Sequence, residues 1–299
     1  MRTVRTVAEL RELLAPERRA GRRIGLVPTM GFFHDGHLSL MRRARADCDV
    51  VVVSLFVNPA QFAAGEDLET YPRDEQGDSA LAQGEGVDFL FAPPLDQVYP
   101  AGFDSVVRVR GLTEVLCGDP RQRGPEHFDG VTTVVVKLFN MVGPDVAYFG
   151  QKDAQQALVV KRLVRDLDIP VQVEVCPTLR EPDGLAMSSR NAYLSDAERG
   201  RAAALSRALA AADDAVRNGE RRPVAVLEAA RTELQSAGVE PEYLELRSAT
   251  DLSPVEQVNG STLLAVAARV GPARLIDNTV LGADAGPVYP AGPRRGGRR

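Results

Sequence analysis

Residues 24–40 read IGLVPTMGFFHDGHLSL, and the change of pattern within them indicates the architecture of the first half of the chain. The apolar, β-branched run Ile24–Pro28 predicts a strand that is buried on both faces of a sheet. A loop containing Gly31 follows, and we expect a helix to start near Gly36 or His37. A buried strand that turns directly into a helix is the unit of doubly wound α/β folds.

The same alternation of strand and helix continues through the first half of the chain. Further strands are expected at Val50–Val57, Val87–Phe91, Asp145–Phe149 and Val171–Cys176, and helices near Ala8–Ala20, His37–Cys48, Glu75–Gln83, Val131–Val142 and Ala154–Asp166. This pattern predicts a Rossmann-like doubly wound parallel sheet. Ligands of such sheets gather at the carboxyl ends of strands, near a switch in strand order.

The composition shifts from about Asp196 towards helices rich in Ala, Arg and Glu. Helices are expected at Asp196–Asn218 and Val224–Ser236, followed by strands at Tyr243–Arg247, Thr262–Val270 and Leu275–Leu281. We therefore expect a Rossmann-like domain over residues 1–185 and a smaller α+β domain over 186–287. The Arg-rich end, 288–299, is expected to be a disordered tail, with RNA binding by its RRGGRR sequence as the alternative.

Composition excludes several classes of protein. The 299 residues carry 36 basic and 41 acidic side chains, a formal net charge of -5, which argues against nucleic acid as the main partner. Three widely spaced cysteines, Cys48, Cys117 and Cys176, indicate reduced thiols in a cytoplasmic protein and neither a disulfide framework nor a zinc site. The longest apolar stretch, Val50–Val57, is far shorter than the roughly 20 residues that span a membrane, and the N-terminus lacks the apolar region of a signal peptide.

Two of the three histidines, His34 and His37, lie at the first strand-to-helix corner. A helix start offers free backbone N–H groups and a partial positive charge, so this corner can take phosphate. Two imidazoles there would donate hydrogen bonds to phosphate oxygens and stabilise charge that develops at a transferred phosphorus. The alternatives are a zinc pair, which more usually has i, i+4 spacing with a carboxylate nearby, and two incidental surface histidines.

Six motifs, in order along the chain, resemble those of one family. They are Pro28–Gly31 (PTMG), His34–His37 (HDGH), Phe56–Phe62 (FVNPAQF), Tyr71–Arg73 (YPR), Phe149–Gln156 (FGQKDAQQ) and Asp183–Arg190 (DGLAMSSR). The histidine motif after a first strand is similar to the signature of the HIGH-type nucleotidyltransferase superfamily. The whole set resembles the pantoate–β-alanine ligase (pantothenate synthetase) family, which is typically homodimeric.

This resemblance implies an ATP-dependent ligase. Pantoate and ATP would give pantoyl adenylate and pyrophosphate, and the amine of β-alanine would then displace AMP to give pantothenate. The resemblance implies the catalytic residues His34, His37 and Lys152, with His37 as proton donor, and an ATP site that comprises Met30, Gly31, His34, His37, Gly150, Gln151, Lys152, Asp153, Leu179, Met187, Ser188, Ser189 and Arg190. Only three of the 36 basic residues are lysines, and a compact ammonium at Lys152 suits a tight phosphate site; an incidental lysine is the alternative.

The resemblance also implies the acceptor site. Asn58, Gln61, Gln156 and Met30 would hold pantoate, because neutral amides orient a carboxylate without weakening it as a nucleophile as much as arginine would. Pro28, Met30, Phe56 and Phe62 are candidates for an apolar wall around its gem-dimethyl group, and for the two phenylalanines core packing is an equal alternative. Mg²⁺ is expected to arrive with ATP, with Asp78 and Asp153 as candidate carboxylates and no protein metal ligand assigned.

Three departures from the family pattern concern the site. Gln151 stands where the family usually has Glu, Ala154 replaces a frequent aromatic residue, and the loop before Phe128 is longer than usual, so that Arg121 and Arg123 are both candidates for its substrate-side arginine. His127, in the segment before the expected helix at Val131, is interpreted as an anchor for this loop. Two rival functions remain: another HIGH-type nucleotidyltransferase with a different small acceptor, and a non-catalytic nucleotide-binding protein.

Overall fold

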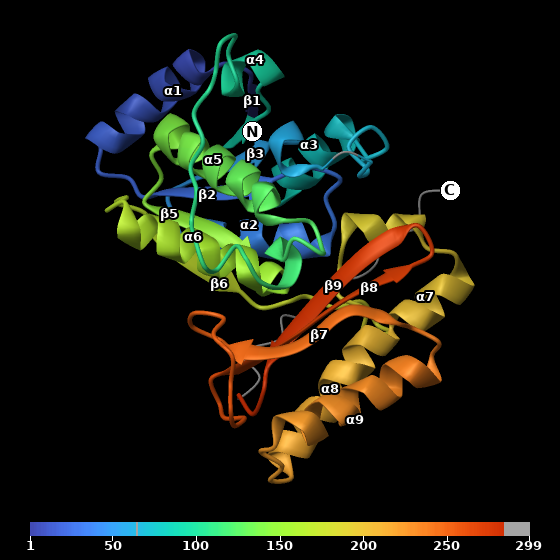
Figure 1. Cartoon of the computed structure of the whole chain (residues 1–299). Coiled ribbons are helices and arrows are strands. Elements are labelled where there is room, and N and C mark those ends of the chain that lie inside the picture. The colour runs from blue at the N-terminus through green and yellow to red at the C-terminus, as the bar shows by residue number, and fades with distance from the viewer. Residues whose placement is uncertain (64, 284–299) are drawn as a thin grey trace. The chain divides into compact units, whose positions relative to one another are not determined.

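The computed structural model describes residues 1–63 and 65–283, which form two compact units (Figure 1). The first unit comprises Met1–Gly150 and Gln156–Cys176, and the second comprises Gln151–Gln155 and the described chain from Pro177 onward. The domain boundary expected between residues 185 and 186 stays a prediction, and the compact units divide at different places. The expected tail, 288–299, and the last expected residues of the second domain, 284–287, lie outside the described residues.

A six-stranded sheet forms the centre of the first unit, and its strands run in the order β1-β4-β3-β2-β5-β6. All of its strand pairs are parallel. The strands are β1 (Arg2–Val4), β2 (Ile24–Thr29), β3 (Val50–Leu55), β4 (Phe89–Phe91), β5 (Val146–Gly150) and β6 (Gln172–Cys176). The inner strand β3 is buried along almost its whole length, as its unbroken apolar run predicts.

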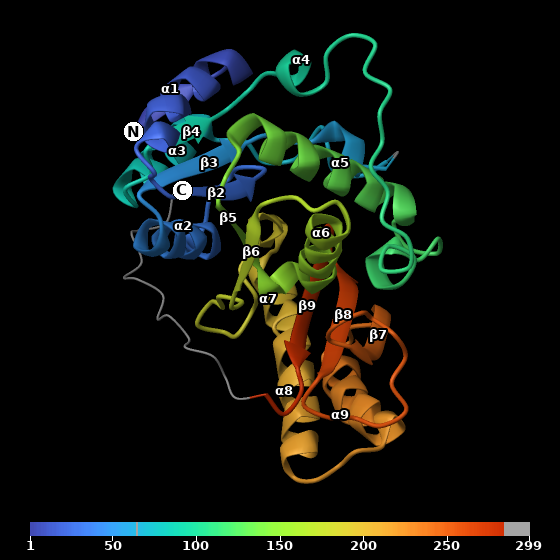
Figure 2. The ribbon, with the colours of Figure 1, turned by 90° about the vertical axis from the view of Figure 1, so that its left-hand side faces the viewer.

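Helices cover both faces of this sheet, with α2 on one side and α1 and α5 on the other (Figure 2). The helices are α1 (Val7–Arg19), α2 (Asp35–Asp47), α3 (Glu75–Gly84), α4 (Leu95–Val98), α5 (Pro125–Val142) and α6 (Ala154–Asp166). Leu38, Met41 and Ala44 of α2 pack with buried strand residues such as Val27 and Tyr148. These layers confirm the predicted Rossmann-like α/β class.

The order of the strands reverses beside β2. The chain passes from β2 outward through β3 to β4, and then returns to place β5 on the other side of β2. A doubly wound sheet binds ligands at the carboxyl ends of the strands at such a switch. In this chain the carboxyl end of β2 leads into the segment Met30–His37, and the carboxyl end of β5 is Gly150.

Two elements differ from expectation. The edge strand β1 was not predicted, because its three residues, RTV, are too few to show a period, and it exists through pairing with β4. Helix α5 begins at Pro125, six residues before the expected start at Val131, so His127 lies within its first turn. Gly124, with φ +79°, followed by proline at the first helical position explains the early start.

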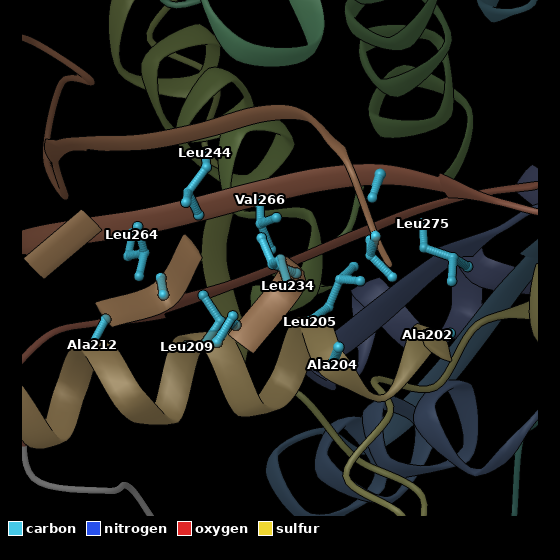
Figure 3. Packing of buried hydrophobic residues seen from close by; sticks show 14 of the residues in the cluster. Ala202, Ala204, Leu205, Leu209, Ala212, Leu234, Leu244, Leu264, Val266 and Leu275 are labelled. Carbon is cyan, nitrogen blue, oxygen red and sulfur yellow. The ribbon is translucent and has the colours of Figure 1, made fainter. Parts of the chain in front are cut away.

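The second unit is α+β, as predicted. Its helices are α7 (Asp196–Ala202), α8 (Ala204–Arg217) and α9 (Pro223–Ser236), and its antiparallel strands are β7 (Pro241–Ser248), β8 (Thr262–Val270) and β9 (Ala273–Val280) in the order β7-β8-β9. Figure 3 shows Leu205 and Leu209 of α8 packed with Leu234 of α9 beneath Val266 of β8.

The helix expected to run continuously over 196–218 is broken at Ala203. The four consecutive residues Ala202 to Leu205 are all buried, and a straight helix cannot turn four consecutive side chains to one apolar face. The break therefore lets both helices bury their ends.

Within residues 1–63 and 65–283, none of the helices has the length and apolar character needed to cross a membrane.

Candidate active site

The corner after β2 is held in shape by a buried carboxylate. Asp78, which is 2% exposed on α3, accepts hydrogen bonds from the backbone N–H groups of Phe32 and Phe33, both at 2.7 Å. Gly31 has φ +90°, and a Cβ there would lie 2.6 Å from Leu55 and 3.0 Å from Asp78. The loop therefore requires glycine at this position and is pinned by the carboxylate just before the two histidines.

His34 and His37 lie together at the start of α2. His34 is the N-cap of the helix, which begins at Asp35 and so slightly earlier than expected. The two ring centroids are 4.1 Å apart. Nδ1 of His34 accepts from the N–H of Gly36 at 3.2 Å, and Nδ1 of His37 accepts from the N–H of His34 at 3.4 Å. A nitrogen that accepts carries no proton, so each neutral ring is protonated on Nε2.

The side chains of Asn58 and Gln61, two predicted pantoate-binding residues, are hydrogen-bonded to each other. Nδ2 of Asn58 donates to Oε1 of Gln61 and to the carbonyl of Gly130, both at 3.0 Å. Its Oδ1 accepts from the hydroxyl of Tyr99 at 2.8 Å. Burial raises the pKa of Tyr99 to about 12, and the bond to Asn58 opposes that rise. Asn58 is 1% exposed. Its buried amide therefore holds the side chain of Gln61 in place through their hydrogen bond.

Gly130 on α5 allows the 3-10 turn Pro59–Gln61 to approach the helix. A Cβ at residue 130 would lie 2.1 Å from the carbonyl oxygen of Ala60 and 2.7 Å from the backbone nitrogen of Gln61. Both contacts are with backbone atoms, which cannot rotate away. The position of Gln61 thus depends on the absence of a side chain on α5.

The long loop before α5 meets Gln61 through Arg123. The guanidinium of Arg123 forms an ion pair with Glu66 and approaches the carbonyl of Gln61 at 3.4 Å. Burial of Glu66 acts to raise its pKa, but the hydrogen bond and charge of Arg123, together with the backbone N–H of Ala63 and the charge interaction with His127, outweigh that effect and leave the pKa lowered. The side chain of Arg121, by contrast, is 85% exposed and pairs with Asp119. Of the two candidate arginines, Arg123 is therefore the one that contacts a predicted substrate residue.

His127 fixes the same carbonyl. Its Nδ1 lies 2.7 Å from the carbonyl oxygen of Gln61, and its Nε2 lies 3.3 Å from Nη1 of Arg123. Because a carbonyl can only accept and a guanidinium can only donate, the ring is neutral with its proton on Nδ1. This is the geometry of a loop anchor, and it is the opposite tautomer to that of His34 and His37.

The remaining predicted residues of the first unit follow β2 and β3 or lie on α6, and Phe62 comes directly after the 3-10 turn Pro59–Gln61. Phe56 is buried and 6.2 Å from the ring of Tyr99, whereas Phe62 is half-buried with its ring 5.8 Å from Tyr71. Met30 and Gln156 are both partly exposed. Phe56 and Phe62 thus each join an aromatic pair, which is compatible with packing and with an apolar wall.

In the second unit, Gln151–Asp153 form a 3-10 turn that leads into α6. Asn278 on β9 donates from Nδ2 to the carbonyls of Gln151 and Lys152, both at 2.9 Å. Nε2 of Gln151 donates to Oδ1 of Asn278 at 3.0 Å. Gln151 and Asn278 thus form a reciprocal pair of hydrogen bonds.

The segment from Leu179 to Arg190 folds back on itself. The N–H of Met187 donates to the carbonyl of Leu179 at 3.0 Å, and the N–H of Gly184 donates to the carbonyl of Glu181 at 2.8 Å to close a tight turn. Ser188 caps the following 3-10 turn through its hydroxyl, which accepts from the N–H of Arg190 at 3.3 Å. Ser189 is only 8% exposed.

Three contributors to these arrangements were not predicted: Tyr99, Asn278 and the structural role of Asp78. Each acts on a segment that is distant in sequence, since Tyr99 reaches Asn58 across 41 residues and Asn278 reaches Gln151 across 127. No local spacing signals such contacts. The one usable signal was the polar run Asp277–Thr279 between the apolar residues of the expected strand Leu275–Leu281.

Comparisons with known proteins agree with these features. The profile of the family described as pantoate-beta-alanine ligase matches residues 2–280. Pantothenate synthetase from Moorella thermoacetica is 52% identical over 282 residues, covering 94% of this chain and 99% of the relative. The one from Cereibacter sphaeroides is 54% identical over 276 residues, covering 92% of this chain and 98% of the relative.

Solved structures are similar over the same span. The crystal structure of pantothenate synthetase from Thermus thermophilus has a TM-score of 0.89 and 48% identity, covering 94% of this chain and 99% of that one. Pantoate-beta-alanine ligase from Francisella tularensis, solved in complex with beta-gamma ATP and beta-alanine, has a TM-score of 0.76 and 32% identity, with coverage of 94% and 97%. The rival assignment to another nucleotidyltransferase is not favoured. This chain belongs to the pantoate–β-alanine ligase family.

Proposed function

We propose that this chain condenses (R)-pantoate with β-alanine at the expense of ATP, through pantoyl adenylate, and releases AMP and pyrophosphate. The match to the family over residues 2–280 carries the proposal. The bonded amide pair Asn58–Gln61 and the capped histidine corner support the same chemistry, because the first can orient a carboxylate and the second can receive phosphate.

In the first half-reaction, a carboxylate oxygen of pantoate attacks the α-phosphorus of ATP. A P–O bond forms, the bond to the bridging oxygen breaks, and pyrophosphate leaves. His34 and His37 present protonated Nε2 atoms, which suits donation to phosphate oxygens as negative charge shifts. Lys152 and Arg190 supply positive charge, and Ser188 and Ser189 supply hydroxyl groups, for the β and γ phosphates.

The remaining contacts of ATP would come from backbone and short side chains. Met30 and Gly31 lie in the pinned corner after β2, and Gly150, Gln151 and Asp153 surround Lys152. Leu179 and Met187, whose backbones share a hydrogen bond, would contact the nucleotide. Gln61, Gln156, Asn58 and Met30 would hold pantoate.

In the second half-reaction, the amine of β-alanine attacks the acyl carbon of pantoyl adenylate. A C–N bond forms, the C–O bond to AMP breaks, and the amine passes a proton to solvent water. Since acyl adenylates are reactive, holding the amine close to the carbonyl supplies most of the rate. His37, with its proton on Nε2, suits donation to the leaving phosphate.

Mg²⁺ is proposed to bind together with ATP, where it neutralises phosphate charge. Residues 1–63 and 65–283 contain no group of three or more His, Cys, Asp or Glu side chains arranged to hold a metal ion, so ATP itself would supply most ligands. Asp78 is already bonded to two backbone N–H groups, which leaves Asp153, beside Lys152, as the better carboxylate candidate.

We also propose a cytoplasmic homodimer without membrane or nucleic acid partners. The three widely spaced, buried cysteines Cys48, Cys117 and Cys176 support a reducing compartment, and the acidic balance argues against nucleic acid. The family resemblance supports the dimer, which sedimentation equilibrium would measure.

Pantoate-dependent exchange of label between pyrophosphate and ATP, without β-alanine, tests the function. The ligase predicts exchange that requires pantoate and that other hydroxy acids support poorly. Exchange that depends on a different small acceptor would favour the rival nucleotidyltransferase. Folded protein that binds ATP but catalyses no exchange would leave only a non-catalytic nucleotide-binding role.

A further inference from the structure

Asn278 makes an unusual set of contacts for a side chain on a C-terminal strand. It is 5% exposed, and its single amide nitrogen donates to two consecutive backbone carbonyls, those of Gln151 and Lys152. The two hydrogens of that nitrogen are thus both used on one turn. The two carbonyls belong to the peptide groups on either side of the Cα atom of Lys152. Because each peptide group is planar, these hydrogen bonds fix the direction in which the side chain of Lys152 projects from the backbone.

Asn278 is itself held on three sides. Its own N–H donates to Oδ1 of Asp277 at 2.8 Å, its backbone pairs with Ala265 of β8, and its Oδ1 accepts from Gln151. A donor that is locked by its neighbours positions another group more exactly than a mobile one does.

Asp277 extends the same anchor to the other face of the strand. Its carboxylate, 3% exposed, accepts from Nη1 and Nη2 of Arg180 at 2.6 and 3.1 Å. Arg180 also donates to the carbonyl of Gly184, within the segment that contains Leu179 and Met187. Adjacent side chains of a strand point to opposite faces. Asn278 therefore holds the turn that contains Lys152 on one face of β9, and Asp277 holds Arg180 on the other.

We infer that Asn278 is a positioning residue for adenylation, which acts by fixing the backbone from which Lys152 projects. The inference rests on the proposed function, since it assigns the effect to the residue that would contact the departing phosphates. It also gives the three-stranded sheet of the second unit a part in the chemistry beyond packing.

The test compares Asn278→Asp with the isosteric control Thr279→Val on the neighbouring position of β9. The aspartate keeps an acceptor for Gln151 but turns a carboxylate oxygen towards two carbonyl oxygens. Pantoate-dependent exchange should fall about 10²-fold in kcat, the usual effect of a misplacement of about 1 Å. Aminolysis of supplied pantoyl adenylate, which needs no β or γ phosphate, should match the wild type, and Thr279→Val should match it in both assays.

A double-mutant cycle with Lys152→Ala separates positioning from general damage. If Asn278 acts through Lys152, adding Asn278→Asp to Lys152→Ala should cause no further loss of exchange. A fully additive loss, or equal losses in both half-reactions, would overturn the inference. If Asn278→Asp unfolds at the assay temperature, Asn278→Ser, which keeps one donor, takes its place with the same expectations. Wild-type protein without exchange would instead reject the proposed function.

Discussion

Lys152 is the residue whose chemistry the sequence singles out most sharply, as one of three lysines among 36 basic residues. If its ammonium stabilises charge on the departing pyrophosphate, Lys152→Ala should reduce exchange by about 10²-fold or more, as removal of a single transition-state donor does. ATP binding, measured by calorimetry, should change far less.

Lys152→Arg is the matched variant, and Lys161→Arg, on the exposed side of α6, is its control. A broad guanidinium should not restore exchange at residue 152, whereas the substitution at 161 should be silent. Equal losses in exchange and in ATP affinity would mean that Lys152 contributes uniform binding only.

Asp78 is a carboxylate whose role depends on its partners rather than on its motif. Asp78→Asn leaves one side-chain oxygen for two backbone N–H groups, so the N–H of either Phe32 or Phe33 loses its hydrogen bond to residue 78. The free energy of unfolding in urea should fall by about 1–3 kcal/mol, with a loss of exchange as the histidine corner loosens.

The exposed Asp96→Asn is the control for charge alone and should leave both stability and exchange unchanged. If Asp78→Asn kept full stability but lost its Mg²⁺ dependence, Asp78 would be a metal ligand, and its hydrogen bonds to the loop would be secondary.

At the scale of single elements, two helical glycines make a matched pair. A Cβ at Gly130 would collide with the backbone of the turn Pro59–Gln61, whereas one at Gly200 in α7 would meet nothing within 4 Å. Gly130→Ala should therefore destabilise the protein by about 1–3 kcal/mol and raise KM for pantoate, because it displaces Gln61. Gly200→Ala should stabilise it by up to about 1 kcal/mol.

Thermal unfolding and initial-rate kinetics would measure both variants. An unchanged KM for pantoate in a folded Gly130→Ala variant would argue that Gln61 does not contact this substrate. A loss of stability in Gly200→Ala would show that the helix α7 has neighbours other than those described.

Most elements could be predicted because their signals are local. Strand β3 follows from an unbroken run of valines and α6 from an apolar stripe, and both lie where expected. The three-residue β1 and the early start of α5 could not, because pairing with β4 and the turn at Gly124 create them. The same limit applies to the site: the motifs identify His34 and His37, but nothing near Asn278 in sequence points to Lys152.

At the scale of the whole molecule, each unit has its own hydrophobic core. Leu205 on α8 is 1% exposed within the core of the second unit. Leu205→Ala should lower the free energy of unfolding by about 2–5 kcal/mol, and Val224→Ala, at a position 80% exposed, should have almost no effect.

Hydrogen exchange would show where that loss is felt. Amides of α8, α9 and β8 should exchange faster, while those of β2 and β3 should keep their protection. Faster exchange throughout both units would mean that they unfold as one cooperative body.

The amino-acid sequence alone determined the α/β class, the second α+β unit and the family, and it supplied the candidate site residues as predictions, because periodicity and short motifs are encoded by neighbours along the chain. Tertiary structure alone decided which groups hold that site in place. Asp78 bonds to the loop before the two histidines, and Tyr99 and Gly130 bond to Asn58. Asn278 bonds to the turn that contains Lys152. These contacts join residues that are 41 to 127 positions apart in the sequence. A hydrogen bond depends on distance in space, and only the folded chain brings those partners within reach.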